Sequence, residues 1–279
     1  MSANFVGASP GSAEPHHQLP RILHDAVQYG WDAFVVAKTE VRKLRHDPTE
    51  LLTRAIQPAL WLLIFGKAFE HIRAIPTGNV DYLTFMTPGI LAQSVMFIAI
   101  FYGLSIIWDR DQGILQKLLV MPVPRASFVT GKALGAGVRA LSQALVVFAL
   151  ALLLGVHVHW SLIGIVGTLL TVLAGAGFFA TLSMLIAILV KTRERFMGMG
   201  QVITMPLFFA SNAIYPISMM PGWLQVLAKG NPLSYLVDLL RGYLLYGHVD
   251  GAVTDWAILL GALLVAQVIA GRYYHAIMQ

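Results

Sequence analysis

Long apolar segments alternate with short polar ones along the 279 residues of this chain. A helix rises 1.5 Å per residue, so an apolar helix of about 20 residues crosses the hydrocarbon core of a bilayer. The pattern predicts an all-α polytopic membrane protein with six transmembrane helices. We expect these at residues 51–69, 83–107, 128–155, 161–190, 196–216 and 253–271.

The segment before the first span has a different pattern. Residues 1–28 are rich in Gly, Ser, Pro and His towards their start, and we interpret them as a mobile cytoplasmic tail. Residues 29–46 place Trp31, Phe34 and Val41 near one helical face and cations on the others. This is typical of an amphipathic interfacial helix lying at anionic headgroups. Residues 47–279 then form the six-span transmembrane domain.

The loop between the second and third spans has to lie outside the bilayer because it opens with charged residues, from Asp109 to Asp111. Behind them Leu115, Leu118 and Leu119 recur at helical spacing, and proline at position 122 ends the pattern. We predict a short amphipathic helix here, with a contact surface on the cytoplasmic side.

Two further short helices are predicted between the fifth and sixth spans. Asn231 is suited to cap the second of them, and Pro232 to be its first residue. Asp238 and Arg241 stand three residues apart and can form a pair. Neither helix is long enough to span, so we expect both at the outer boundary or dipping partway into the membrane.

Composition and charge narrow the function. The chain is 57% hydrophobic and 12% charged, against about 25% charged residues in an ordinary soluble domain. The +5 net charge is distributed among the loops, which argues for membrane topology and against nucleic-acid binding. Most Lys and Arg residues fall on one side of the six spans, so both termini are predicted to be cytoplasmic. The chain has no cysteine, and we predict no catalytic residue and no metal site.

The cytoplasmic loop resembles a known family. An acidic pair, a glycine, a Leu-Leu pair, Pro-x-x-Arg and Gly-Lys entering the next span are similar to the first cytoplasmic loop of ABC type-2 permeases. In that family the loop is the coupling helix that docks on the nucleotide-binding subunit. The resemblance implies a role in ATPase coupling for Asp109, Arg110, Asp111, Gly113, Leu115, Leu118, Leu119, Pro122 and Arg125.

The segment after the fifth span carries a second resemblance. Its run Pro-x-Trp-Leu-Gln, Asn-Pro-Leu-Ser-Tyr and Asp-x-x-Arg is similar to the C-terminal part of exporter permeases, especially the daunorubicin and multidrug group. The residues of the outer helices that carry this resemblance are Trp223, Asn231, Pro232, Tyr235, Asp238 and Arg241.

These resemblances imply the permease subunit of an ATP-driven exporter in a bacterial inner membrane. The chain itself has no phosphate-binding Gly-x-x-x-x-Gly-Lys-Ser/Thr motif. The resemblance therefore implies two copies of a partner ATPase that bind Mg-ATP, a second copy of this permease, and surrounding membrane lipids. In the family, spans two and five line the substrate pathway. Arg139 in the third span either extends toward the cytoplasmic headgroups or meets an anionic substrate near the entry side. The pathway residues we predict are Phe97, Phe101, Arg139, Phe208, Asn212 and Tyr215.

Other functions stay open at this point. A hydrophobic drug, a lipid, a glycolipid or a polysaccharide would each fit the resemblance. From a different class, a membrane-embedded prenyl or glycolipid transferase would use Asp109 and Asp111 to hold a magnesium diphosphate. An ion-coupled carrier is a third interpretation, which calls for charges at mid-membrane or broken helices in matched halves.

Overall fold

The computed structural model describes residues 31, 35, 38, 42, 56–70, 80–113, 125–190 and 192–273. The predicted tail at residues 1–28 lies outside these ranges. The predicted interfacial helix is represented by four residues, Trp31, Val35, Lys38 and Arg42, each of which is helical. Residues 51–55, the start of the first predicted span, also lie outside the described part.

Every regular element in the described ranges is helical. After a helical segment at residues 56–60, the elements are η1 (Trp61–Gly66, a π-helix), α3 (Lys67–Glu70), α4 (Tyr82–Tyr102), α5 (Leu104–Asp111), α7 (Arg125–Leu153), α8 (Leu162–Leu189), α9 (Arg193–Phe209), η2 (Ile217–Met219), α10 (Gly222–Gly230), α11 (Pro232–Arg241), η3 (Gly242–Tyr246) and α12 (Ala252–Arg272).

Four helices among the described residues are long and apolar enough to cross a membrane, namely Tyr82–Asp111, Phe128–Leu153, Leu162–Leu189 and Ala252–Arg272. They correspond to four of the six predicted spans. A shorter apolar helix, Ile56–Gly66, falls within the first predicted span.

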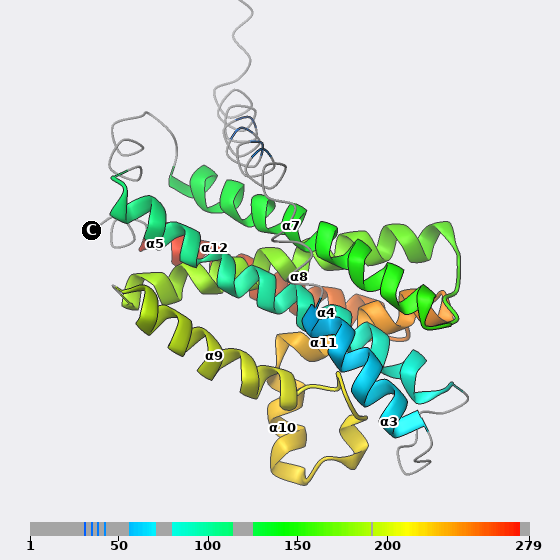
Figure 1. The fold of residues 1–279 in the computed structure, drawn as a ribbon. Helices are drawn as coiled ribbons and strands as arrows, with labels where there is room; N and C mark the ends of the chain where they lie inside the picture. The colour runs from blue at the N-terminus through cyan, green and yellow to red at the C-terminus, as the bar shows by residue number, and fades with distance from the viewer. Residues whose placement is uncertain are drawn as a thin grey trace, which may run out of the picture.

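Helix α4 lies at the centre of the fold and is buried along nearly its whole length. It contacts α7 and α8 along its length and is also packed against α11 and α9 (Figure 1). A helix that is apolar on all faces can be buried on all faces, and the sequence of α4 has this character. Helix α8 is also largely buried, whereas α12 exposes most of its surface.

Polar residues fix where several helices begin. Asp81 accepts a hydrogen bond from the backbone N–H of Thr84, and Ser161 accepts one from Gly164. Asn231 caps α11 through the backbone N–H of Leu233, with Pro232 in the first turn, as predicted. These caps satisfy amide groups that the first helical turn leaves without partners.

Residues 196–216 differ from their prediction as a single span. Helix α9 starts at Arg193 and ends at Phe209, so the prediction of helix is wrong for the last third of the segment, residues 210–216. The chain beyond α9 instead crosses α4 closely, where the hydroxyl of Tyr82 donates to the carbonyl of Ile214 at 3.2 Å. A Cβ atom on Gly89 would lie 2.1 Å from the carbonyl oxygen of Ala213, so this approach requires glycine.

A second difference is the break between α4 and α5, inside the predicted span at residues 83–107. The interruption falls at Gly103, where an added Cβ would lie 1.7 Å from Oγ of Ser183. That hydroxyl donates to the carbonyl of Ile100 at 2.6 Å, so α8 reaches into the last turn of α4. A side chain inserted into the backbone ladder in this way interrupts a helix.

Candidate functional site

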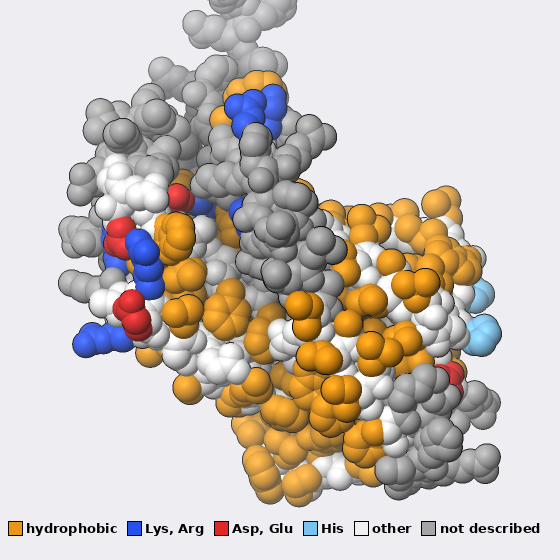
Figure 2. Space-filling view, in the orientation of Figure 1, with side chains coloured by type: hydrophobic (Ala, Val, Ile, Leu, Met, Phe, Trp, Pro, Cys, Tyr) orange, Lys and Arg blue, Asp and Glu red, His pale blue; other side chains and the backbone are white. Residues whose placement is uncertain are grey.

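The charged side chains gather at the end of the molecule formed by the last turn of α5 and the first turns of α7 and α9. Figure 2 shows most of the Lys, Arg, Asp and Glu side chains in view at this end, histidines at the opposite end, and hydrophobic side chains between them. We call this the charged end; its described charged residues are Asp109, Arg110, Asp111, Lys132, Arg193, Glu194, Arg195 and Arg272.

A buried ion pair joins α5 to α7 at the charged end. Lys132 Nζ lies 2.7 Å from Asp109 Oδ2, and the two residues are only 3% and 8% exposed. The same ammonium lies 5.5 Å from the ring centroid of Tyr102 and 5.9 Å from that of Phe128. A buried charge is stable only with such a partner, so this pair fixes the position of α5 against α7.

A second ion pair joins α5 to the start of α9. Arg193 Nη2 lies 3.0 Å from Asp111 Oδ2, with both side chains 42% exposed. The Arg193 guanidinium also lies 4.7 Å from the ring centroid of Trp108. The last turn of α5, which leads into the loop after Asp111, is therefore ion-paired to both α7 and α9.

The structure describes only part of the predicted coupling set. Asp109, Arg110 and Asp111 form the last turn of α5, and Gly113 follows with a φ of 68° that favours glycine. The predicted short helix, with Leu115, Leu118, Leu119 and Pro122, lies outside the described residues, as does the side chain of Arg125. Sequence reasoning missed the partners Lys132 and Arg193, although two acids at a membrane boundary signal that cations lie nearby.

A cleft of about 460 Å³ lies between residues 57–58 of the first apolar helix, α4, α7 and α9. Phe97 and Phe101, two of the predicted pathway residues, stack in it with ring centroids 5.9 Å apart. The rest of its lining is largely uncharged and polar, from Gln57, Pro58, Ser94, Ile98, Gln143 and Gln201. Aromatic faces with amide groups suit an amphipathic molecule that carries hydroxyl or carbonyl groups.

The three glutamines of this cleft were not predicted as site residues. Each stands alone among apolar residues in its own segment, and only the packing of three helices brings them together. Uncharged polar side chains within apolar segments are the signal that could have identified them.

The other predicted pathway residues lie outside this cleft. The Arg139 guanidinium is 5.3 Å from the ring centroid of Tyr102. Phe208 is fully buried and packs edge-on against Trp61 with centroids 5.5 Å apart. Tyr215 donates a hydrogen bond to the carbonyl of Phe209 at 2.8 Å.

Asn212 belongs instead to a polar cluster between α11 and the chain after α9. Its side-chain amide donates to Asp238 at 2.6 Å, and its backbone carbonyl accepts from Arg241 at 2.8 Å. Arg241 also lies 3.6 Å from Asp238 and 4.1 Å from the ring centroid of Phe85, which confirms the predicted i,i+3 pair. Burial raises the pKa of the Asp238 carboxyl, and both Arg241 and the Asn212 amide oppose that rise.

The remaining outer residues complete this cluster. Asn231 donates from its amide to the carbonyls of Leu207 at 2.6 Å and Ala210 at 3.0 Å, and so fixes the end of α9. Tyr235 donates to the carbonyl of Lys229, and Trp223 on α10 is exposed. Asn231, Asp238 and Arg241 thus hold the end of α9 and the chain that follows it.

Within the described ranges, no three His, Asp or Glu side chains lie close enough together to bind a metal ion. Asp109 and Asp111, the acidic pair of the transferase interpretation, form ion pairs with Lys132 and Arg193.

Comparison with known proteins identifies relatives that are transport permeases. A putative transport permease, ycf38, of Cyanophora paradoxa is 32% identical over 221 residues, which cover 78% of this chain and 74% of the relative. The daunorubicin resistance ABC transporter permease protein DrrB1 of Streptomyces coeruleorubidus is 26% identical, over 71% of this chain and 69% of its own. Nodulation protein J of Rhizobium leguminosarum bv. trifolii is 28% identical, over 78% and 81%. The profile of the ABC-2 type transporter family matches residues 32–245, and the chain therefore belongs to this family of membrane transport permeases.

Proposed function

We propose that the chain is the membrane-spanning permease subunit of an ATP-driven exporter. It moves a hydrophobic or amphipathic substrate, drug-like or lipid-like, out of the cytoplasm or the inner leaflet. The observation that carries this proposal is the charged end, where the entry to the cytoplasmic loop is ion-paired to both α7 and α9 in a chain of the ABC-2 family.

Energy comes from a separate ATPase in this proposal, because the chain lacks a phosphate-binding loop of its own. Two copies of the ATPase bind Mg-ATP and act on two copies of the permease. Each permease has six spans in a bacterial inner membrane, with both of its termini in the cytoplasm. Closure of the ATPase pair displaces the loop that follows Asp111. The pairs Asp109–Lys132 and Asp111–Arg193 then transmit the displacement to α7 and α9.

The cleft with Phe97 and Phe101 is the substrate contact that we propose. Helices α4 and α9, which correspond to spans two and five, both line it, and a displacement of α9 would change its width. Its lining carries amides but no charge, which favours an uncharged or delocalised aromatic group over a strongly anionic one. The likeness to a daunorubicin resistance permease makes daunorubicin a suitable probe.

The first experiment purifies the tagged full-length chain from its native membrane and identifies co-purifying proteins by mass spectrometry. We expect a separate protein with Walker motifs in an amount equal to the permease. A variant with Leu118→Glu should lose this protein while its membrane insertion is unchanged, because a charge disrupts the apolar contact face of the predicted coupling helix.

Two results would contradict the proposal. One is recovery of the chain alone under conditions that keep other membrane complexes intact. The other is unchanged recovery of the ATPase with Leu118→Glu, which would remove the docking role from this loop. A magnesium-dependent transferase activity that is lost in the Asp109→Ala/Asp111→Ala variant would support the transferase interpretation instead.

A further inference from the structure

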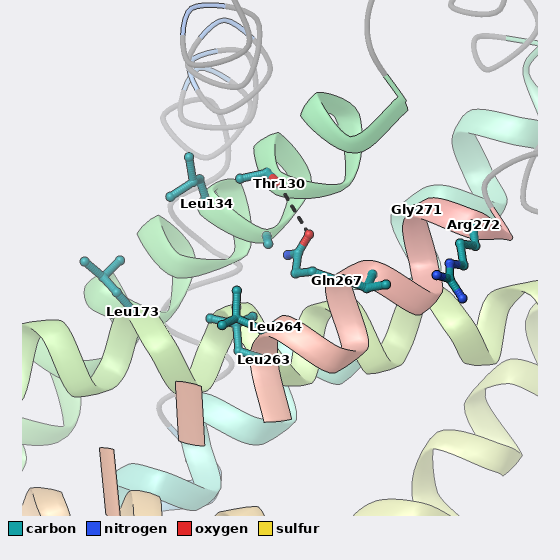
Figure 3. A pocket seen from close by; sticks show the side chains of 11 residues that line it. Thr130, Leu134, Leu173, Leu263, Leu264, Gln267, Gly271 and Arg272 are labelled. Carbon is teal, nitrogen blue, oxygen red and sulfur yellow. Dashed lines mark hydrogen bonds between the residues drawn. The ribbon is translucent and has the colours of Figure 1, made fainter. Parts of the chain in front are cut away.

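A second cavity, of about 660 Å³, opens between α7, α8 and α12, away from the substrate cleft. We call it the α12 groove. Leu134 and Leu173 line it from α7 and α8, and α12 contributes Leu264, Gln267 and Arg272. Figure 3 shows the leucines towards one end of this groove, Gln267 pointing towards Thr130 in the middle, and Arg272 at the other end.

The chemistry of the groove changes in a fixed order along α12. Leu264 lies eight residues before Arg272 and Gln267 lies five before it, which places them about 12 Å and about 7.5 Å from the arginine along the helix. An apolar region, a polar region and a cation therefore follow one another from the membrane interior to the charged end. A phospholipid has the same order, from acyl chain through ester to phosphate.

The polar part of the groove is held in place by hydrogen bonds. The Gln267 amide donates to Oγ1 of Thr181 at 3.0 Å, and the hydroxyl of Thr130 donates to the Gln267 carbonyl at 3.4 Å. These contacts join α12 to both α7 and α8 and fix the Gln267 side chain at the depth where the ester groups of a lipid would lie.

Arg272 places a guanidinium at the mouth of the groove. Its side chain is exposed, and within the described part of the chain no carboxylate lies at ion-pair distance from it. Of the acids at this end, Asp109 and Asp111 pair with Lys132 and Arg193, and Glu194 forms no ion pair with Arg272 among the described residues. Charge complementarity therefore favours an anionic occupant.

The position of α12 indicates that this occupant comes from the bilayer. Its apolar stretch is only 11% buried, and Leu264 and Val268 beside the groove are 64% and 55% exposed. Exposed leucine and valine at the depth of a spanning helix face hydrocarbon chains. A cation at the same end of that helix lies at headgroup level, where basic pockets between spans bind anionic lipid.

We propose that the α12 groove binds one anionic phospholipid of the leaflet at the charged end, with an acyl chain along Leu173 and Leu264 and the phosphate on Arg272. This assignment requires membrane insertion alone and is independent of the ATPase partner.

Native mass spectrometry of the full-length chain in detergent tests the proposal, with phosphatidylglycerol and phosphatidylcholine added separately. We expect tighter binding of phosphatidylglycerol. Arg272→Gln should weaken it roughly fivefold, the factor equivalent to about 1 kcal/mol for one basic residue near anionic lipid. Arg272→Lys should retain it, and Arg195→Gln, an exposed cation of the same end outside the groove, should leave it unchanged.

A steric variant separates the groove from a general charge effect. Leu264→Trp should fill the groove and reduce binding of both lipids, while Leu170→Trp on the exposed face of α8 should not. Equal phosphatidylglycerol binding by wild type, Arg272→Gln and Leu264→Trp would overturn the proposal. A change of oligomeric mass with Leu264→Trp would overturn it as well, since a second copy of the chain would then be the occupant.

Discussion

At the scale of single residues, the buried pair of Asp109 and Lys132 differs in kind from the exposed pair of Asp111 and Arg193. Burial removes hydration from both members of the first pair, so each depends on the other. Lys132→Met should lower the free energy of unfolding by about 3–5 kcal/mol, because it removes the ammonium that lies 2.7 Å from a buried carboxylate. Thermal denaturation of the purified chain in detergent measures this loss.

The exposed pair is the matched control. Arg193→Gln should cost no more than about 1 kcal/mol, because both side chains of that pair are 42% exposed to solvent. The double variant Asp109→Leu/Lys132→Met should recover most of the stability lost by Lys132→Met alone. Equal losses for Lys132→Met and Arg193→Gln would contradict the distinction.

Sequence reasoning located one member of each pair but not the other. Asp109 and Asp111 stand out because charged residues follow a long apolar segment. Their partners lie 23 and 82 residues further along the chain. The packing of the helices decides which residues pair over such sequence distances, so a local sequence pattern cannot predict the partner.

At the scale of helices, the substrate cleft is a product of packing between four elements. We expect Phe101→Ala to raise roughly fivefold the daunorubicin concentration that half-maximally stimulates ATP hydrolysis by the reconstituted complex with its ATPase. The reason is the loss of an aromatic contact that contributes about 1 kcal/mol. Gln57→Leu should act in the same direction because it removes an amide from the lining.

The control for this series is Leu170→Ala, an exposed leucine of α8 that does not line the cleft. Its half-maximal concentration should equal that of wild type. If Phe101→Ala and Gln57→Leu also gave the half-maximal concentration of wild type, the cleft would not be the substrate contact. This conclusion would hold whether or not the ATPase binds the permease.

Helix boundaries could be predicted where local chemistry sets them. Ser161 and the Asn231-Pro232 pair carry capping signals, and α8 and α11 begin where these signals place them. The end of α9 at Phe209 and the break at Gly103 depend on distant contacts, from Asn231 and Ser183 respectively. An apolar sequence is compatible with helix at both places, so hydrophobicity alone carries the fifth predicted span past Phe209 and does not show the local interruption at Gly103.

At the scale of the whole molecule, the two ends differ in charge, and this difference predicts orientation. Arg193, Arg195 and Arg272 lie at the charged end, which the positive-inside rule places in the cytoplasm. Asp250 precedes α12, whose 21 residues rise about 31 Å to Arg272, roughly one bilayer core. Asp250 should therefore face the outside of the cell.

Cysteine labelling tests this orientation directly because the chain contains no cysteine of its own. Asp250→Cys and Arg195→Cys each introduce one thiol at an exposed position. In intact cells a membrane-impermeant maleimide should label Asp250→Cys and not Arg195→Cys, and permeabilised cells should give labelling of both. The reverse pattern would invert the topology and place the loop after Asp111 out of reach of any cytoplasmic ATPase. Labelling of both in intact cells would show that α12 does not separate two compartments.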